Sequence, residues 1–359
     1  MKRPLTSYLR LIAGVAGIVV VSIALAGYLL AACGSATTNS VAAPGTTAAA
    51  LGAVLSTDLS HVDFVDSTHG WVVGDRGTIL TTSNGGRSWR AQTSGTTSWL
   101  RGVDFVDASH GWAVGGNGTI LATTDGGSTW RPEVARTALD EQLTAVHFLD
   151  RMRGWAVGGG VNGLLLASRD GGATWHVEGS KQPNYLNSVS FVDRSHGWVL
   201  GDFGTLLSTT DGGTHWRAQR LGLTAAAQNS ASLQRLVDSS AVTFVDKLHG
   251  WVVGDFGSIQ ATASGGRSWR VELSGTHETL TSVVFTDLSH GWVVGNHGTI
   301  LATTDGGSSW HSQHSGTTEN LQSVSFVGPM RGWAVGDHGT ILATSDGGLS
   351  WHIQMGPKS

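Results

Sequence analysis

Cysteine is almost absent from this chain of 359 residues, which contains only Cys33. A lone cysteine cannot form an internal disulfide, so packing alone must stabilise the folded part. Proline is also scarce, at 6 residues, and only 13% of the residues are charged. These values exclude a disulfide-stapled mini-protein and a highly charged or proline-rich disordered chain.

Positive charge is scarce where a nucleic-acid-binding protein would need it. The chain has a formal net charge of −4. Its first 33 residues hold Lys2, Arg3 and Arg10 and no acidic residue, which leaves 19 Lys and Arg against 26 Asp and Glu in the remainder. Phosphate backbones bind basic surfaces, so no nucleic-acid partner is expected.

The N-terminal segment reads as an export signal. An unbroken apolar run, residues 11–30, follows the basic residues and is typical of a signal peptide, although it is long enough to be an uncleaved membrane anchor. The run ends in Leu-Ala-Ala-Cys-Gly, which resembles the bacterial lipobox, whose cysteine is lipidated. We therefore predict that residues 1–33 are a signal peptide with lipidation at Cys33, or a membrane anchor, and that the remainder is extracytoplasmic and held at the cell membrane.

Residues 34–57 are small and polar, without a periodic apolar pattern. This composition predicts a flexible linker.

Tryptophan and glycine are abundant, with 15 and 52 residues, and their positions repeat. The dipeptide Gly-Trp recurs at intervals of 41 to 53 residues, at Trp71, Trp112, Trp155, Trp198, Trp251, Trp292 and Trp333. A second tryptophan follows each of these, at Trp89, Trp130, Trp175, Trp216, Trp269, Trp310 and Trp351. Fourteen tryptophans in a fixed pattern predict a repeated core, and only Trp99 lies outside it.

One repeat, beginning at Leu280, illustrates the expected unit. Its β-branched and aromatic stretches predict strands at residues 282–285, 292–295 and 299–303 and a fourth strand at Trp310. Gly298 is expected to supply the positive φ of the turn between the second and third strands. Short strands that are apolar on both faces, at a period near 41, are typical of propeller blades. We predict an all-β fold, a single seven-bladed β-propeller of four-stranded antiparallel blades, over residues 58–356.

The turn between the third and fourth strands resembles the Asp box of bacterial sialidases and sortilin-type receptors, a Ser/Thr-x-Asp-x-Gly-x-x-Trp hairpin. One such turn reads TTDGGSTW around Asp125. We expect structural roles for its aspartates, which are Asp125, Asp170, Asp211, Asp305 and Asp346. Asn84 and Ser264 replace the aspartate in blades one and five.

The full repeat joins V-x-F-x-D, G-W-A/V-V-G and G-T-I-L-A-T-x-D-G-G-x-x-W. Over residues 60–354 it closely resembles the photosystem II assembly and stability factor family of lumenal or extracytoplasmic seven-bladed propellers. The resemblance implies a non-enzymatic, monomeric scaffold without cofactor or metal, whose partner is a membrane complex or its assembly intermediate. The matched residues build the blades, so they leave open which protein is bound and whether the host is photosynthetic.

Function is expected where the repeats differ. With strands named A to D outward, the B–C turns and the D–A linkers share one face, where Arg and aromatic residues of the kind enriched in protein interfaces recur. The candidates for partner binding are Arg76, Trp99, Arg101, Tyr185, Phe203, Phe256, His297 and His338. The alternative is that unconstrained turns vary without function.

The opposite face carries a histidine before Gly-Trp in five blades, at His69, His110, His196, His249 and His290, with Arg153 and Arg331 in the other two. No local metal-ligand spacing accompanies them. We predict a repeated turn hydrogen bond rather than a metal site.

Carbohydrate binding or glycoside hydrolysis is the alternative function, because Asp-box propellers include sialidases. A sialidase needs a tyrosine nucleophile, and Tyr185, the one tyrosine after Cys33, is expected in a linker. Paired-carboxylate catalysis on this fold would use a cleft between two propellers. Two further questions stay open: whether residues 53–56 add a strand to the last blade, and whether the long linker at 220–241 binds a partner.

Overall fold

The computed structural model describes residues 57–133, 141–160, 162–178, 184–221 and 239–357, which belong to one compact unit. The predictions for Cys33, the export signal, nearly all of the linker 34–57, the strand at 53–56 and most of segment 220–241 lie outside the described residues. Within the described part of the chain, no helix is long and apolar enough to cross a membrane.

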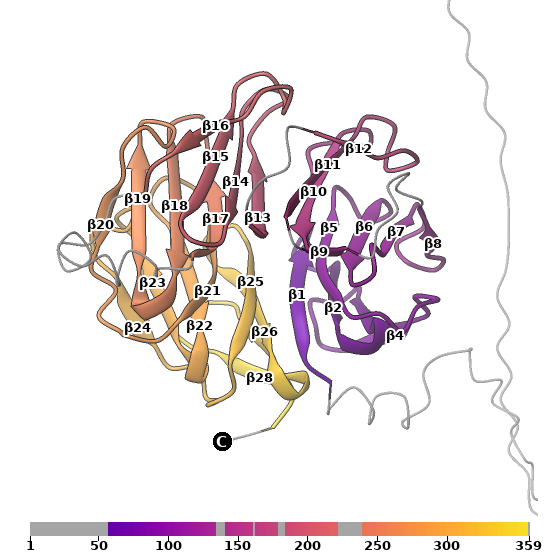
Figure 1. Ribbon diagram of the computed structural model, residues 1–359. Helices are drawn as coiled ribbons and strands as arrows, with labels where there is room; N and C mark the ends of the chain where they lie inside the picture. Colours follow the sequence, from indigo (N-terminus) through magenta and orange to yellow (C-terminus); the bar gives the residue numbers. More distant parts are fainter. Residues whose placement is uncertain (1–56, 134–140, 161, 179–183, 222–238, 358–359) are drawn as a thin grey trace, which may run out of the picture. The chain divides into compact units, whose positions relative to one another are not determined.

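Seven four-stranded antiparallel sheets follow one another along the chain, and Figure 1 shows them in sequence colours from indigo to yellow. Blades 1 to 4 comprise β1 (Leu59–Phe64), β2 (Gly70–Gly74), β3 (Ile79–Thr82), β4 (Arg90–Gln92); β5 (Leu100–Phe105), β6 (Gly111–Gly115), β7 (Ile120–Thr123), β8 (Arg131–Pro132); β9 (Gln142–Phe148), β10 (Gly154–Gly159), β11 (Gly163–Ser168), β12 (His176–Val177); and β13 (Leu186–Phe191), β14 (Gly197–Gly201), β15 (Thr205–Thr209), β16 (Arg217–Gln219).

Blades 5 to 7 comprise β17 (Ser239–Phe244), β18 (His249–Gly254), β19 (Ile259–Ala263), β20 (Arg270–Glu272); β21 (Leu280–Phe285), β22 (Gly291–Gly295), β23 (Ile300–Thr303), β24 (His311–Gln313); and β25 (Leu321–Val327), β26 (Arg331–Gly336), β27 (Ile341–Thr344), β28 (His352–Met355). The predicted seven-bladed propeller is confirmed. The fourth strand of the repeat parsed above begins after Trp310 rather than at it.

The innermost strands are neighbours in chain order, and β25 packs beside β1, where yellow meets indigo in Figure 1. At this closing seam Val62 N donates to Ser323 Oγ at 3.3 Å and Phe64 N donates to Ser325 Oγ at 3.2 Å. The sheet of blade 7 contains only β25 to β28 among the described strands. Side-chain packing and hydrogen bonds therefore join the last blade to the first.

Stacked aromatic rings form the core between blades. Phe64 stacks on Trp333 of the preceding blade at 3.5 Å between ring centroids and meets Trp89 of its own blade edge-on at 5.9 Å. The same arrangement recurs in every blade. Twelve of the fourteen repeated tryptophans are buried, and Trp216 and Trp269 are partly buried. Such rings contribute large apolar areas and favourable ring geometry.

The glycine of each Gly-Trp dipeptide is required by this packing. A Cβ atom at Gly70 would lie 2.4 Å from Cζ of Phe64, and the other six equivalent glycines meet the phenylalanine of their own blade in the same way. Any side chain here would displace the stacked ring, which explains why glycine precedes tryptophan in every repeat.

The free edge of each innermost strand is partly satisfied by side chains from the preceding blade. Phe105 N donates to Asp63 Oδ2 at 2.8 Å, and Phe148 N donates to Asp104 Oδ2 at 2.7 Å. Serine performs the same role elsewhere, as at Ser190. Buried backbone N–H groups need acceptors, so these polar residues hold successive blades in register.

Candidate protein-binding face

The B–C turns carry an unusual backbone conformation at their tips. In the described part of the chain, six residues other than glycine have positive φ, between 52° and 57°, and every one is the central residue of a B–C turn. They are Arg76, Asn117, Phe203, Phe256, His297 and His338. Gly298 has the predicted positive φ, at 67°, and His297 before it adopts the same conformation, at 52°. A left-handed residue with a side chain costs about 1–2 kcal/mol.

Two of these tips are phenylalanines that face solvent. Phe203 on blade 4 is 63% exposed and Phe256 on blade 5 is 61% exposed. Leu273, which directly follows β20 on the same face, is 90% exposed. Large apolar residues in solvent-exposed, strained positions point to a role in binding rather than in the core.

The two histidine tips are held by acidic residues of the adjacent linkers. His297 Nδ1 lies 2.7 Å from Glu278 Oε2, and His338 Nδ1 lies 2.7 Å from Glu319 Oε2. The hydrogen bond and the negative charge of Glu319 raise the pKa of His338. Both imidazoles remain largely exposed on blades 6 and 7.

Three further candidates gather at the starts of the inner strands. The Arg101 guanidinium carbon lies 5.1 Å from the ring centroid of Trp99, a cation–π distance, and Arg101 Nη1 donates to Ser60 Oγ at 3.2 Å. Tyr185 Oη donates to Gln142 Oε1 at 3.5 Å. Burial raises the pKa of Tyr185, and the charge of Arg101 acts in the opposite direction. The structure thus brings Trp99 and Arg101 together with Tyr185 nearby, whereas the turn-tip candidates stand on separate blades.

A cluster of titratable residues between the inner strands of blades 1 to 3 escaped sequence reasoning. Burial and the neighbouring Asp104 raise the pKa of Asp63 to about 8, and burial raises that of Asp104 to about 7. Burial lowers the pKa of His61 to about 4 and also lowers that of His147. The signal was present, since VDF and VHF stand where four other blades have Ser, Thr or Val before phenylalanine.

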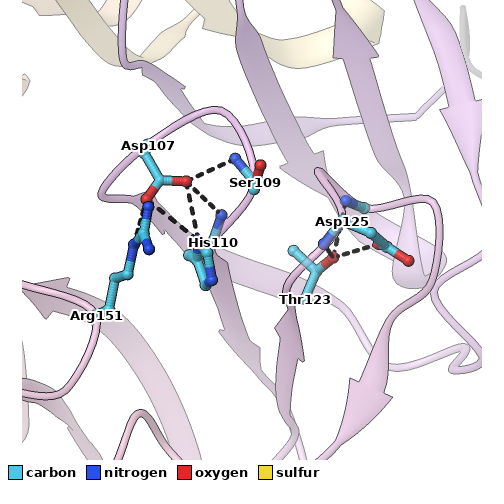
Figure 2. A network of polar contacts seen from close by, with 7 residues as sticks. Asp107, Ser109, His110, Thr123, Asp125 and Arg151 are labelled. Atoms are coloured by element: carbon cyan, nitrogen blue, oxygen red, sulfur yellow. Dashed lines mark hydrogen bonds and ion pairs between the residues drawn. The ribbon is translucent and has the colours of Figure 1, made fainter.

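The opposite face is built from repeated turn contacts, and Figure 2 shows one of them. Asp107 accepts hydrogen bonds from the backbone N of Ser109 and His110 and lies 3.0 Å from His110 Nδ1. Arg151 of blade 3 reaches across to Asp107 at 2.8 Å. The other four histidines pair with an aspartate three residues earlier in the same way. The predicted turn hydrogen bond is confirmed, and the described residues contain no group of three or more metal-ligating side chains suited to an ion.

The Asp-box turns lie on the same opposite face. Asp125 Oδ1 accepts from Thr129 N at 2.9 Å, and Thr123 Oγ1 accepts from Gly127 N at 2.8 Å. Figure 2 shows Thr123 and Asp125 of this turn beside the Asp107 network. The aspartates at 170, 211, 305 and 346 make the equivalent backbone contact. Hydrogen bonds to Thr129 lower the pKa of Asp125. In the two divergent turns, Asn84 and Ser264 accept the same backbone bond.

These features define a class, a single-ring seven-bladed propeller with Asp-box turns on one face and variable turn tips on the other. The family model described as "Photosynthesis system II assembly factor YCF48" matches residues 50–99, 92–178, 133–221, 177–237 and 270–358. The chain belongs to this family. No curated protein sequence matches it.

Solved structures show the same fold at low sequence identity. "YCF48 bound to D1 peptide" has a TM-score of 0.65 and 19% identity, covering 80% of this chain and 92% of its own. YCF48 from Cyanidioschyzon merolae has a TM-score of 0.65 and 21% identity, covering 80% and 95%. The GH74 xyloglucanase from Xanthomonas campestris has a TM-score of 0.63 and 15% identity, covering 83% and 54%. At these identities the likeness concerns the fold.

Proposed function

We propose that this protein is a non-enzymatic, extracytoplasmic scaffold that binds a segment of a membrane protein on its B–C face and assists assembly or stability of that protein's complex. Membership of the assembly-factor family supports a protein-binding assembly role. A propeller of the same fold that carries a D1 peptide supports a peptide segment as the bound element.

The observation that carries the proposal is the set of six side chains in left-handed turn tips, all on one face. Glycine would occupy each position at lower conformational cost. Side chains retained at a cost in stability are expected to act outside the fold. Phenylalanine, arginine and histidine at these tips, with Trp99 and Arg101 nearby, provide the aromatic and guanidinium groups that dominate protein interfaces.

The proposed location outside the cytoplasm, at the membrane, rests on the N-terminal sequence. We propose that Cys33 is lipidated after export, which would hold the scaffold close to membrane-embedded partners. A Cys33→Ser variant is then expected to lose incorporation of radiolabelled palmitate. Labelling that persists in this variant would contradict lipidation at Cys33.

Catalysis is not supported by the candidate residues. Burial raises the pKa of Tyr185, which opposes the ionisation that a nucleophilic tyrosine needs. The xyloglucanase similarity covers 54% of that enzyme.

The test is a mild-detergent purification of the native protein from its host's membranes, with mass spectrometry of co-purifying proteins. Replacement of Arg76, Trp99 and Arg101 by alanine should remove the bound membrane-complex subunits. Replacement of Thr124, Thr210 and Ser308, exposed residues of the opposite face, should retain them. Loss of no subunit with the first set, or binding to a glycan array in place of protein, would overturn the proposal.

A further inference from the structure

A glutamine amide bridges neighbouring blades at some seams and not at others. At the seam between blades 1 and 2, Trp130 Nε1 donates to Gln92 Oε1 at 3.0 Å, and Gln92 Nε2 donates to the Gly126 carbonyl at 2.9 Å. Gln313 and Gln354 make the same two bonds at the 6/7 and 7/1 seams. The bridge requires one acceptor and one donor, which an amide provides.

Three blades have glutamate at the equivalent position, three residues after the second tryptophan, namely Glu133, Glu178 and Glu272. Blade 4 has Gln219 there, which donates to Ser208 Oγ at 2.7 Å within its own blade. A carboxylate has no donor for the glycine carbonyl, so it cannot complete the bridge. Glu178 instead pairs with Arg169 at 3.3 Å. The tryptophans opposite these glutamates, Trp175, Trp216 and Trp310, have buried indole N–H groups without a partner in the described part of the chain.

The seam between blades 3 and 4 lacks a second bond as well. Six of the Gly-Trp tryptophans donate their indole N–H to a glycine carbonyl of the next blade. The seventh, Trp155, is 3% exposed, and its Nε1 has no partner among the described residues. Two buried indole donors therefore lie unused at one seam.

Both donors face the place that glutamine fills elsewhere. A Cβ built on Gly127 would lie 2.1 Å from Gln92 Oε1. At Gly213, the equivalent glycine of blade 4, the nearest atoms to the same point include Trp155 Nε1 at 3.4 Å and Trp216 Nε1 at 3.6 Å. The space that the amide occupies at a bridged seam is thus bordered here by two N–H groups.

A cavity of about 240 Å³ opens at this seam, and Arg153, Trp155, Arg169, Arg194 and Asp211 are among the residues that line it. Arg194 pairs with Asp150 at 3.0 Å, and Arg169 pairs with Glu178 as described. Asp211 accepts hydrogen bonds from its own turn.

Arg153 differs from these residues. It stands where five blades have the turn histidine, and its guanidinium has no partner in the part of the chain that the structure describes. Two lining residues therefore carry donors without a partner among the described residues, the Arg153 guanidinium and the buried indole N–H of Trp155.

We propose that the cavity between blades 3 and 4 binds a carboxylate group, supplied by an acidic peptide side chain or by a small free carboxylate. Arginine binds carboxylates through two parallel hydrogen bonds, and the indole N–H of Trp155, which lines the cavity, is a further donor that only an acceptor can satisfy. The volume is below the range of about 300–1,000 Å³ that is typical of drug-sized ligands, so a single compact group fits. The site faces away from the B–C turns and does not depend on the function proposed for them.

The test follows the tryptophan indole N–H resonances of the ¹⁵N-labelled protein by NMR at constant ionic strength. Sodium acetate is titrated first, with sodium chloride and sodium sulfate as control anions. The peptides acetyl-Ala-Glu-Ala-amide and acetyl-Ala-Gln-Ala-amide then distinguish a peptide source from a free carboxylate. Tryptophan-to-phenylalanine variants at 155 and 216 assign the two resonances.

We expect saturable shifts of these two resonances with acetate or with the glutamate peptide and not with chloride. Arg153→Ala should weaken the affinity by about tenfold or more, because a charge-assisted hydrogen bond is lost. Arg331→Ala should leave it unchanged, because Arg331 occupies the same position beside the bridged 7/1 seam.

Several results would overturn the proposal. These are the absence of a saturable shift, equal affinity in Arg153→Ala, or a preference for sulfate over both carboxylate probes. Thermal unfolding of each variant confirms that it is folded.

Discussion

At the scale of single residues, side chains are retained where backbone conformation favours glycine. The B–C turn tips adopt left-handed φ values with Phe, His, Arg and Asn in place of glycine. Binding requirements and folding requirements therefore oppose each other at these positions. A mutation there should change stability and partner binding in opposite directions.

Phe256→Gly should change stability and binding in opposite directions. Relief of the left-handed strain gains about 1–2 kcal/mol, and the entropy of glycine in the unfolded chain offsets about 0.5–1 kcal/mol of it. We expect the free energy of unfolding in urea to rise by up to about 1.5 kcal/mol while partner binding weakens. Phe256→Ala is the control, because it removes the ring and keeps the strain. Equal stability of the alanine and glycine variants would contradict this account.

The buried pair Asp63 and Asp104 should make stability depend on pH. Their folded pKa values, about 8 and about 7, lie above the ordinary pKa of an aspartate, so the folded state holds protons that the unfolded state has released. Stability conferred in this way is lost as pH rises towards the folded values. The histidines with lowered pKa values act in the opposite direction only below about pH 6.5.

We therefore expect the melting temperature to fall between about pH 6.5 and 8.5 in the wild type. The Asp63→Asn, Asp104→Asn double variant keeps oxygen acceptors for Phe105 N and Phe148 N and should show a flatter profile. Parallel profiles for the two proteins, recorded by circular dichroism, would show that these carboxyls do not control the pH dependence.

The blades could be predicted from the sequence because their packing requires particular residue types at fixed positions. The spacing of Gly-Trp and of the second tryptophan predicted seven sheets, and Phe64 over Gly70 shows why each glycine is needed. The positive φ of Phe256 could not be predicted from the sequence, because bulky residues strongly prefer negative φ. The seam cavity was also missed, because Glu178 differs from glutamine by one group and the consequence appears on another blade. The structural roles assigned to the Asp-box aspartates and the binding roles assigned to the partner-binding candidates stay predictions.

At the scale of elements, the residue three positions after the second tryptophan contributes to how firmly several blades hold the next. Gln313 joins Trp351 to the Gly347 carbonyl, whereas Glu272 pairs with Arg270 at 2.6 Å and leaves the Trp310 indole without a partner among the described residues. Seams of both kinds therefore occur in one ring.

Exchanging glutamine and glutamate at these positions should weaken the seam between blades 6 and 7 and strengthen the seam between blades 5 and 6. Gln313→Glu removes the amide N–H that donates to the Gly347 carbonyl, places a carboxylate beside that carbonyl and should lower the free energy of unfolding by about 1–3 kcal/mol. Glu272→Gln supplies the missing amide donor and should raise the free energy of unfolding by about 1 kcal/mol. Chemical denaturation measures both changes. A stabilising Gln313→Glu would show that the bridge does not contribute.

At the scale of the whole molecule, the ring depends on one seam between residues far apart in sequence. Ser323 and Ser325 accept the backbone N–H groups of Val62 and Phe64 across this seam, and Phe64 stacks on Trp333. Closure brings the B–C tips of all the blades onto one face, so integrity of the ring is a condition for the proposed binding.

Removing the two hydroxyls should weaken closure. Ser323→Ala with Ser325→Ala leaves two buried N–H groups unsatisfied and should cost about 1–3 kcal/mol for each, measured as a lower melting temperature. Ser312→Ala, at an exposed position of β24, is the control and should have little effect. An unchanged melt in the double variant would mean that the aromatic stack alone closes the ring.

The central claim, that the B–C face binds a segment of a membrane protein, is tested most directly by cross-linking in the native membrane. A photoreactive amino acid replaces Phe203, Phe256 or Asn117 on this face, and Thr124, Thr210 or Ser308 on the opposite face, and mass spectrometry identifies the cross-linked peptides. The account predicts that one membrane-protein segment is captured from the B–C positions and not from the opposite positions. Capture of the same segment only from the opposite face would contradict it.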